Sequence, residues 1–322
     1  MNFINNPLKM DKSKQTTLQN KVIFSGVGIH NGRAVTMSVE PANPDTGIVF
    51  ERIDIKHNNT IKAIINNTET SKLCSKITNA YGVSVSTIEH LMAAFNGLNI
   101  DNALIKLDSS ELPALDGSSE EYTNKINKIG IKTQKKNRSF LKILKKISIY
   151  EDERYISVAP ADEFSIDVEI NYPNTIIGSD KLLYVHNKAN FIKHISKART
   201  FAFAEDIQKM RATGLAMGGS LNNAIVVDKY KIVNSTGLRI NNEFIKHKTL
   251  DCLGDFYLLG MPIIGKVTCF APGHKINQNF IKEILKKKTN YKIENGNKYN
   301  SFNSYFNEED TKMQSDKNVY LA

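Results

Sequence analysis

The stretch NNEFIKHKTLDCLGD, residues 241–255, is predicted to form the helix around which the fold is built. In a helix, His247, Asp251 and Asp255 stand at successive i, i+4 positions, so their side chains lie on one face. A buried helix normally carries an apolar stripe there. Imidazole nitrogen and carboxylate oxygen are both good zinc ligands, so His247 and Asp251 can reach one ion together. A third ligand must come from elsewhere in the chain.

The third ligand is expected from STIEHLMAAF, residues 86–95, where two ionisable residues begin another apolar helix. Ser86 and Glu89 also match a capping box, in which Glu89 would bond back to the cap backbone. A lone His90 would more often be a hydrogen-bonded structural histidine than a ligand. The adjacency of Glu89 and His90, together with the second cluster far along the chain, favours a functional site.

The chain has 322 residues, which is long enough for two domains with separate cores. An Asn-Gly pair at Asn31 and Gly32 predicts an early hairpin. Each half then shows strands first, followed by helix, strand and helix, which predicts two related α+β domains, each a sheet packed on helices. The expected divisions are a flexible leader (1–14), a first domain (15–131), a basic linker (132–138), a second domain (139–288) and a disordered tail (289–322).

The net charge of +10 has two interpretations. It reflects either a compositional bias toward lysine or attraction to an anionic partner, such as a diphosphate, an acidic carrier or the anionic inner leaflet of a membrane. Nucleic acid is disfavoured because the lysines are scattered, no aromatic-and-basic motif is found and tryptophan is absent. Three unpatterned cysteines, no apolar run of membrane-spanning length and a polar N-terminal stretch predict a cytoplasmic protein.

The residues alone predict a metal-dependent amide or ester hydrolase. Three nitrogen and oxygen ligands with an open fourth position are typical of a catalytic rather than a structural zinc site. Zinc acidifies water and polarises a carbonyl oxygen. Glu89, beside a ligand, could take a proton from that water, and His274, which follows Pro272 and Gly273, could give one to a leaving amine.

The chain resembles the UDP-3-O-acyl-N-acetylglucosamine deacetylases, zinc amidases of lipid A synthesis in Gram-negative bacteria. The resemblance runs from about Lys14 to Lys288 and is carried by TLQNKVIFSGVGIHNG, STIEHLMAAFNGLNIDNA, ELPALDGSS, ARTFAF, GLAMGGSLNNAIVVD, LRINNEFIKHKTLDCLGD and PGH. It implies hydrolysis of the N-acetyl group of UDP-3-O-(3-hydroxyacyl)-N-acetylglucosamine, with release of acetate. It also implies two stacked domains, each with an inserted element, and an active site between them.

The resemblance assigns roles residue by residue. The zinc ligands match three residues: His90, His247 and Asp251. The catalytic groups match five others: Glu89 as general base, His274 as general acid, Asp255 as the carboxylate that holds it, Lys248 as a supporting charge and Thr200 as the hydroxyl that steadies the oxyanion. Cys74 matches a cysteine that reaches the metal when zinc is in excess, which is an inhibitory role at most.

The substrate end of the resemblance is less complete. The stretch 202–226 matches an insert that walls an apolar passage for the acyl chain, and buried core is an equal alternative for its apolar residues. The substrate contacts expected are Phe201, Arg154, Met217 and Gly219. Relatives often carry a basic residue where this chain has Ala271, and an aromatic ring is expected where it has Ile170. Arg154 is the candidate for a compensating cation.

Two competing hypotheses remain open. One is a metal amidase whose substrate has drifted from UDP, motivated by Ala271 and Ile170. The other is a non-catalytic basic protein that binds membrane or nucleic acid, against which the intact set of ligands, base and acid argues. The leading hypothesis is a monomeric zinc deacetylase acting on a UDP-linked acylated amino sugar, with peripheral contact to the inner membrane surface.

Overall fold

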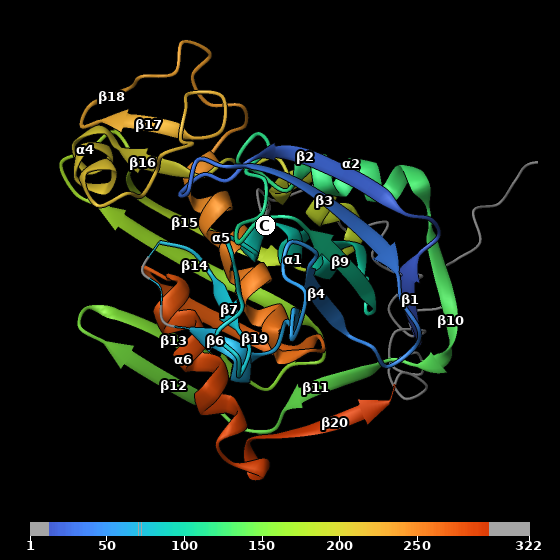
Figure 1. Ribbon diagram of the computed structural model, residues 1–322. Helices are drawn as coiled ribbons and strands as arrows, with labels where there is room; N and C mark the ends of the chain where they lie inside the picture. The colour runs from blue at the N-terminus through green and yellow to red at the C-terminus, as the bar shows by residue number, and fades with distance from the viewer. Residues whose placement is uncertain (1–12, 70, 72, 296–322) are drawn as a thin grey trace, which may run out of the picture.

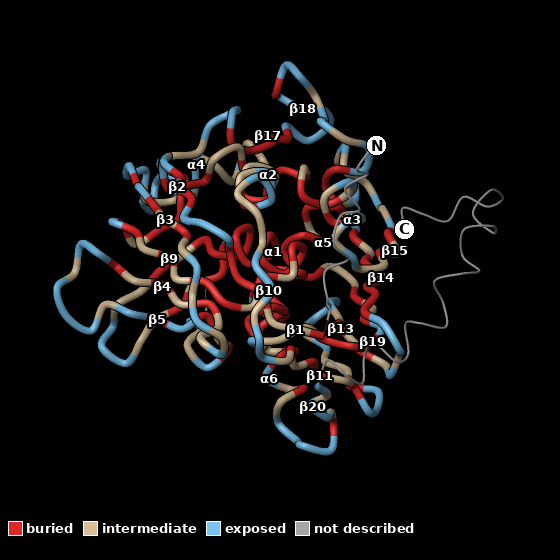
Figure 2. Tube along the Cα trace, turned by 90° about the vertical axis from the view of Figure 1, so that its right-hand side faces the viewer, coloured by how far each residue is buried: buried red, intermediate tan, exposed pale blue. Residues whose placement is uncertain are grey.

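The computed structural model describes residues 13–69, 71 and 73–295, and the remaining residues lie outside that description. Two sheets stand on either side of two buried helices, α1 (Glu89–Leu98) and α5 (Glu243–Phe256), as Figure 1 and Figure 2 show. This arrangement confirms the predicted α+β fold class. Within the described part of the chain, no helix is long and apolar enough to cross a bilayer.

The two sheets repeat one design. The first has the order β2–β3–β9–β4–β5, and the second contains the order β12–β13–β19–β14–β15. In both sheets the third and fourth strands of that order run parallel, and the other neighbours run antiparallel. The bounds are β2 Val22–Val27, β3 Ala34–Pro41, β4 Ile48–Arg52, β5 Thr60–Lys62, β9 Ala103–Leu107, β12 Ile147–Glu151, β13 Arg154–Ala159, β14 Phe164–Tyr172, β15 Gly178–Val185 and β19 Ile263–Phe270.

The helices α1 and α5 hold the same position in the two repeats. A parallel neighbour strand requires a crossover connection, and the segments that contain α1 and α5 are these crossovers. Each crossover also carries a three-stranded insert before its helix: β6 (Thr68–Glu69), β7 (Lys76–Thr78) and β8 (Ser84–Ser86) before α1, and β16 (Phe201–Phe203), β17 (Ile225–Asp228) and β18 (Lys231–Ile232) before α5. The second insert also contains α4 (Ala204–Ala212).

Further elements close each repeat. A helix follows β9 in the first repeat, α2 (Glu120–Ile129), and another follows β19 in the second, α6 (His274–Leu285). The short helical segments are η1 Ile65–Asn67, α3 Lys188–Asn190, the π-helix η2 Phe191–Ile195, η3 Tyr257–Leu259 and η4 Lys288–Asn290. The predicted hairpin is confirmed, because β2 and β3 pair on either side of a turn that contains Gly32 at φ +67°.

Two boundary predictions were wrong in part. The expected linker forms strand β10 (Ile131–Asn137), which pairs with β1 (Lys14–Leu18), and its exposed lysines point away from the core. The tail was predicted to begin too early, because β20 (Tyr291–Asn295) pairs with β11 (Ser139–Ile143). Residues 296–322 of that tail and residues 1–12 of the leader lie outside the described residues.

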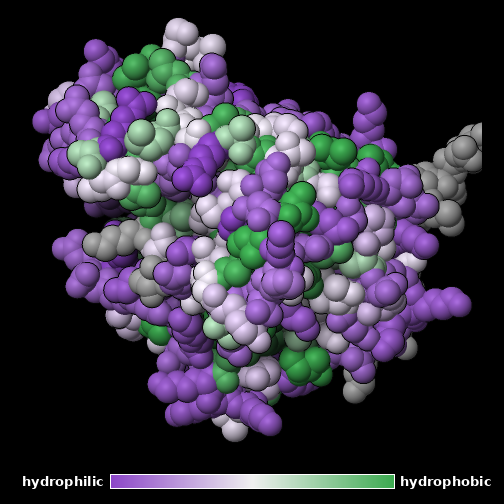
Figure 3. Space-filling view, viewed as in Figure 1, coloured by the Kyte–Doolittle hydropathy of each residue, from purple (hydrophilic) through white to green (hydrophobic). Residues whose placement is uncertain are grey.

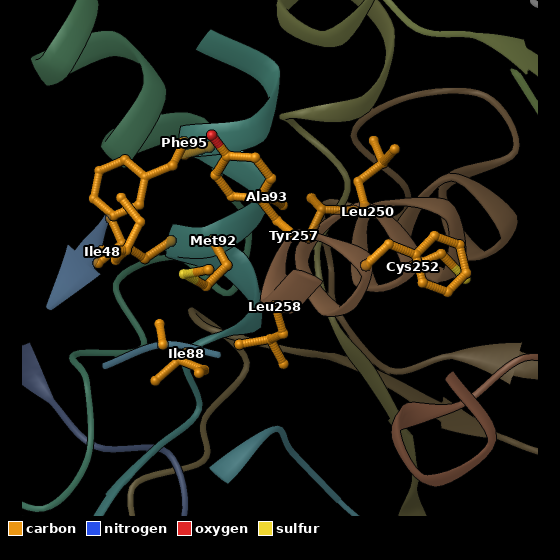
Figure 4. Packing of buried hydrophobic residues seen from close by; sticks show 14 of the residues in the cluster. Ile48, Ile88, Met92, Ala93, Phe95, Leu250, Cys252, Tyr257 and Leu258 are labelled. Carbon is orange, nitrogen blue, oxygen red and sulfur yellow. The ribbon is translucent and has the colours of Figure 1, made fainter. Parts of the chain in front are cut away.

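Helices α1 and α5 cross in close contact at the centre of the molecule. Every residue of α1 is buried, as expected for a helix with core on all sides. Figure 4 shows Met92 and Phe95 of α1 on one side, and Leu250 of α5 with Tyr257 and Leu258 on the other. The amide of Asn96 donates to the carbonyl of Leu253 at 2.9 Å. The crossing therefore joins the two repeats.

Gly254 allows this crossing, and its replacement provides the first test. A Cβ at this position would lie 2.1 Å from the carbonyl oxygen of Glu89. Gly→Ala in a helix normally stabilises by up to about 1 kcal/mol. Here we expect Gly254→Ala to lower the free energy of unfolding by about 1–3 kcal/mol, because the helices must separate.

Denaturant unfolding monitored by circular dichroism measures the effect. Gly273→Ala, at the extended N-cap of α6, is a control for added volume without a clash, since its Cβ would meet its nearest atom at 3.4 Å, an ordinary contact. A Gly254→Ala protein as stable as the wild type would show that the helices are not in close contact.

Candidate metal and acid–base centre

A cavity of about 1110 Å³ opens between α1, α5, the start of α6 and the second insert. Ten of the predicted site residues line it: Glu89, His90, Arg154, Thr200, Phe201, Gly219, His247, Lys248, Asp251 and His274. Asp255 is fully buried behind His274. Met217 is not among the lining residues; it is 56% exposed and its backbone N–H donates to the carbonyl of His30. The structure thus brings together all the predicted groups except Met217.

His90, His247 and Asp251 offer ligand atoms that lie within 4.8 Å of one another. Oδ1 of Asp251 is 3.3 Å from Nε2 of His247 and 3.8 Å from Nε2 of His90. Two ligands held at about 2.0–2.2 Å by one tetrahedral ion stand roughly 3.3–3.6 Å apart. That Asp251 oxygen is buried and has no hydrogen-bond partner among the described residues. The three residues therefore fit a divalent metal ion.

Hydrogen bonds fix the atoms of His247 and Asp251 that do not face the candidate metal position. Nδ1 of His247 donates to the carbonyl of Ala198 at 3.0 Å, which leaves Nε2 free to bind an ion. Nζ of Lys248 donates to Oδ2 of Asp251 at 3.0 Å, and Oδ1 stays free. Burial alone would raise the pKa of Asp251, but His247 and Lys248 outweigh it and hold that pKa well below its usual range. Asp251 is therefore an anion whose Oδ1 could bind a metal ion.

The two histidines are neutral, as metal ligands must be. Burial, and next the neighbouring His247, lower the pKa of His90 to about 3. Burial also lowers the pKa of His247. Their rings stand edge to face, with centroids 5.0 Å apart. Lys248 stays charged, because Asp251 raises its pKa against the effect of burial, and its ammonium lies over the Phe201 ring at 5.4 Å.

Glu89 points into the cavity and does not form a capping box. Helix α1 begins at Glu89, its N-cap is Ile88 without a side-chain bond, and Ser86 lies in strand β8. The Glu89 carboxylate instead accepts a bond from the backbone N–H of Ser75 at 3.0 Å. Burial raises the pKa of Glu89 to about 7, although the positive charge on His274 opposes this. Glu89 can therefore exchange a proton near neutral pH.

His274 faces Glu89 and is held from behind by Asp255. Nε2 of His274 lies 3.8 Å from Oε1 of Glu89, and its Nδ1 is 2.9 Å from Oδ2 of Asp255. Burial alone would lower the pKa of His274, but the carboxylates of Asp255 and Glu89 raise it to about 10. The imidazole is therefore protonated at neutral pH and can donate a proton from Nε2.

Two further residues of this network were not predicted. The Asn277 amide donates to Oδ2 of Asp255 at 2.7 Å, and the Ser75 hydroxyl donates to Oδ1. Asn277 follows His274 by three residues on one helix face, so helical spacing could have indicated it. Ser75 precedes strand β7 of the first insert, and no local pattern places it beside residues of α5 and α6.

Thr200 is held at the cavity by its backbone. Its N–H donates to the carbonyl of Gly117 at 2.8 Å, and its carbonyl accepts from Ile225 at 2.8 Å. Gly117 has φ +82°, and a Cβ there would lie 2.0 Å from the Asn223 carbonyl oxygen. The adjacent Arg199 is anchored to Glu243, the first residue of α5, at 2.8 Å. Thr200 is thus tied to both the first repeat and α5.

The insert supplies an apolar wall. Among the large apolar residues of the predicted passage, Leu215 and Met217 do not line the cavity, whereas the following five do: Phe203, Ile207, Met210, Leu221 and Val226. At the other end, Arg154 and Ala271 line the cavity together with Tyr172. Ile170 is 1% exposed and does not face the cavity.

Comparisons with known proteins give one consistent family. A model of the family LpxC, UDP-3-O-acyl N-acetylglycosamine deacetylase, matches residues 15–286. A UDP-3-O-acyl-N-acetylglucosamine deacetylase of Nitratiruptor sp. is 40% identical over 280 residues, covering 87% of this chain and 93% of the relative. Proteins with the same name are 39% identical in Alcanivorax borkumensis (87% and 92% covered) and 36% identical in Syntrophus aciditrophicus (86% and 88% covered).

The metal site can be tested without any activity. We expect the purified protein to bind one divalent ion per chain, and His90→Ala/Asp251→Ala to abolish that binding. Removal of the ion by a chelator should leave the protein folded, because α1 and α5 are packed by apolar contacts around the site.

Metal analysis and circular dichroism provide the readouts. His57→Ala, which changes an exposed histidine, is the control and should bind as the wild type does. Undiminished binding by the double variant would place the metal elsewhere.

Proposed function

The chain belongs to the UDP-3-O-acyl N-acetylglycosamine deacetylase family, and on that basis we propose that it removes the N-acetyl group of UDP-3-O-(3-hydroxyacyl)-N-acetylglucosamine. The products are the free amine and acetate, in an early committed step of lipid A biosynthesis. The observation that carries this proposal is the orphaned Asp251 oxygen between two imidazoles, beside an acid–base pair 3.8 Å apart. We place the enzyme in the cytoplasm, as a monomer.

The ion that best suits this donor set is zinc. Two neutral imidazoles and one carboxylate form the kind of three-ligand set found in catalytic zinc sites. When bound, zinc would acidify a water molecule and polarise the acetyl carbonyl. His90, His247 and Asp251 would hold it, and Lys248 and the Ala198 carbonyl would keep the ligands oriented.

Glu89 and His274 then divide the proton transfers. Glu89, ionised, takes a proton from water as the water oxygen attacks the acetyl carbonyl carbon. His274, protonated and held by Asp255, gives its Nε2 proton to the nitrogen as the carbon–nitrogen bond breaks. The hydroxyl of Thr200 and the ammonium of Lys248 face the same cavity and would stabilise the negative charge that develops on the carbonyl oxygen.

The cavity accommodates a substrate with one apolar and one polar end. The wall formed by Phe203, Ile207 and Met210 suits the acyl chain, and Arg154 supplies a cation for the diphosphate. Ala271 brings no charge, and Ile170 is buried, so two groups expected at the nucleotide end are missing. This favours a second candidate function, a metal amidase that acts on an acylated amino sugar without UDP.

An acetate-release assay with three substrates tests both candidates. The full substrate should react far faster than one that lacks the 3-O-acyl chain, because each buried methylene contributes about 0.8 kcal/mol. An acylated sugar that lacks UDP should be a poor substrate. Equal kcat/KM with and without UDP would support the second candidate instead.

A matched pair of variants checks the acyl wall. Ile207→Ser should lower kcat/KM for the acylated substrate by roughly tenfold, as expected from the loss of an apolar contact. Leu215→Ser, outside the lining residues, should leave it unchanged. If the acylated and non-acylated substrates react equally, the insert does not hold the acyl chain.

The pH dependence of the rate assigns base and acid. The rate should rise as Glu89 loses its proton and fall as His274 loses its own, giving a bell-shaped profile. The pKa values of about 7 and about 10 place the limbs at or below these pH values, because a bound cation favours the deprotonated form of both groups.

Asp255→Ala should move the basic limb to lower pH, because the His274 imidazolium loses its closest carboxylate. Glu89→Ala and His274→Ala should each lower kcat by roughly 100-fold or more while metal binding persists. Glu163→Ala, which changes an exposed carboxylate that does not line the cavity, is the control. A basic limb that stays in place in Asp255→Ala would mean that His274 is not the acid.

A further inference from the structure

The second insert carries an unusual share of exposed apolar side chains. Of the fifteen large apolar residues exposed in the described part of the chain, six lie between residues 215 and 238: Leu215, Met217, Leu221, Tyr230, Val233 and Leu238. We call these six residues the insert rim. Figure 3 shows apolar side chains at the outer end of the insert, at the top left of the molecule. Exposed apolar residues usually occur singly, so their concentration indicates an interaction surface.

The rim is presented by an ordered backbone. The buried side chain of Asn234 donates to the carbonyls of Leu221 and Ala224 at 2.8 and 2.9 Å, and accepts from the N–H of Val226 at 2.8 Å. On the other side, the Met217 N–H donates to the carbonyl of His30 at 3.0 Å. Hydrogen bonds therefore fix the backbone that carries these exposed side chains.

The charges around the rim favour an anionic partner. In the insert, Lys209 and Lys231 pair with Asp206 and Asp228. Three other cations near the rim have no carboxylate partner among the described residues: Arg33, Arg211 and Lys229. The guanidinium of Arg211 donates to the carbonyl of Gly219 at 3.2 Å. The ammonium of Lys229 lies over the Tyr230 ring at 5.0 Å. Apolar side chains, an exposed tyrosine and cations that are not paired with carboxylates are together typical of protein surfaces that rest at a membrane interface.

The rim is continuous with the apolar wall of the cavity. Leu221 belongs to both, and Met210, Arg211 and Gly219 line the cavity from the adjoining segment. We propose that the insert rim is the surface by which this protein rests on a bilayer that contains anionic lipids. This proposal rests on the proposed function, because contact with a bilayer would serve an enzyme whose substrate carries an acyl chain.

A second basic surface provides an internal comparison. The far end of α6 and the loop after β11 carry six exposed lysines: Lys145, Lys146, Lys282, Lys286, Lys287 and Lys288. Exposed Leu144 and Ile293 lie in the same part of the fold, where the N–H of Leu144 donates to the carbonyl of Asn290. None of these residues lines the cavity. If charge alone bound the protein to a bilayer, this lysine-rich surface would contact the bilayer and the rim would not.

Two triple variants of the full-length protein separate these surfaces. Tyr230→Ser/Val233→Ser/Leu238→Ser removes rim side chains that are 37–64% exposed, none of which lines the cavity. Tyr150→Ser/Leu144→Ser/Ile293→Ser removes side chains that are 46–74% exposed elsewhere. The partition of each protein onto phosphatidylglycerol–phosphatidylcholine vesicles is measured by co-sedimentation. The rim variant should partition at least about tenfold more weakly than the wild type, and the control variant within about twofold of it.

Lys229→Glu is a second probe that leaves the apolar side chains in place, in case the triple rim variant does not fold. It should weaken binding several-fold on vesicles with phosphatidylglycerol and have little effect on phosphatidylcholine alone. Acetate release from a soluble short-chain substrate without vesicles should match the wild type in all folded variants.

Three results would overturn the proposal. One is a wild-type protein that does not bind the vesicles, and another is a control variant that loses binding as much as the rim variant does. The third is self-association of the wild type, seen by sedimentation, that the rim variant abolishes without any vesicle binding, which would make the occupant a second copy of the chain. Vesicle binding uses no substrate, so its failure and a failure of deacetylation are distinguishable.

Discussion

The close contact between α1 and α5 is the constraint on which the rest of the structure depends. Gly254 of α5 faces the carbonyl of Glu89 at the start of α1, and the Asn96 amide bonds to the Leu253 carbonyl across the same contact. Only at such a short separation can His90, from one repeat, meet His247 and Asp251, from the other. The candidate metal site is therefore formed at the interface between two copies of one sheet-and-helix design.

Burial of charge at this interface is offset by specific partners. Asp251 and Asp255 stand one helical turn apart, yet their surroundings differ. Asp251 has Lys248 on one oxygen and a free second oxygen, whereas Asp255 is bonded to His274, Asn277 and Ser75. An uncompensated buried carboxylate would be costly, so these partners offset the burial of both charges. They leave an oxygen that could bind a metal ion on Asp251 alone, and they tie Asp255 to His274.

The two inserts occupy the same place in the two repeats but contribute different groups to the cavity. The first, β6 to β8, brings Ser75 to the acid–base pair, through the Glu89 carboxylate and Asp255. The second, β16 to β18 with α4, brings the apolar wall of the cavity and the exposed rim. The repeated framework thus fixes the candidate metal ligands and the Glu89–His274 pair, while the inserts make the two sides of the cavity different.

The spacing of residues along the sequence was sufficient to predict the central elements of this protein. The i, i+4 spacing of His247, Asp251 and Asp255 placed three polar groups on one helix face, because that relation depends only on the helical repeat. The order of strands and helices likewise indicated two related α+β halves. Long-range pairing decided the rest. The run 132–138 is a strand because β1 lies beside it, and residues 291–295 are a strand because β11 does.

The tertiary structure also decided the role open to Glu89. A local rule predicted a helix cap, but Ser86 lies in strand β8, and the Glu89 carboxylate is held by Ser75 and faces His274. Met217 was predicted to contact the substrate, but its backbone bonds to the hairpin turn and its side chain lies outside the cavity. Sequence spacing determines which side chains share one face of an element. Which faces meet, and with what partners, depends on contacts between residues up to about two hundred positions apart, such as Ser75 with His274 and Gln278.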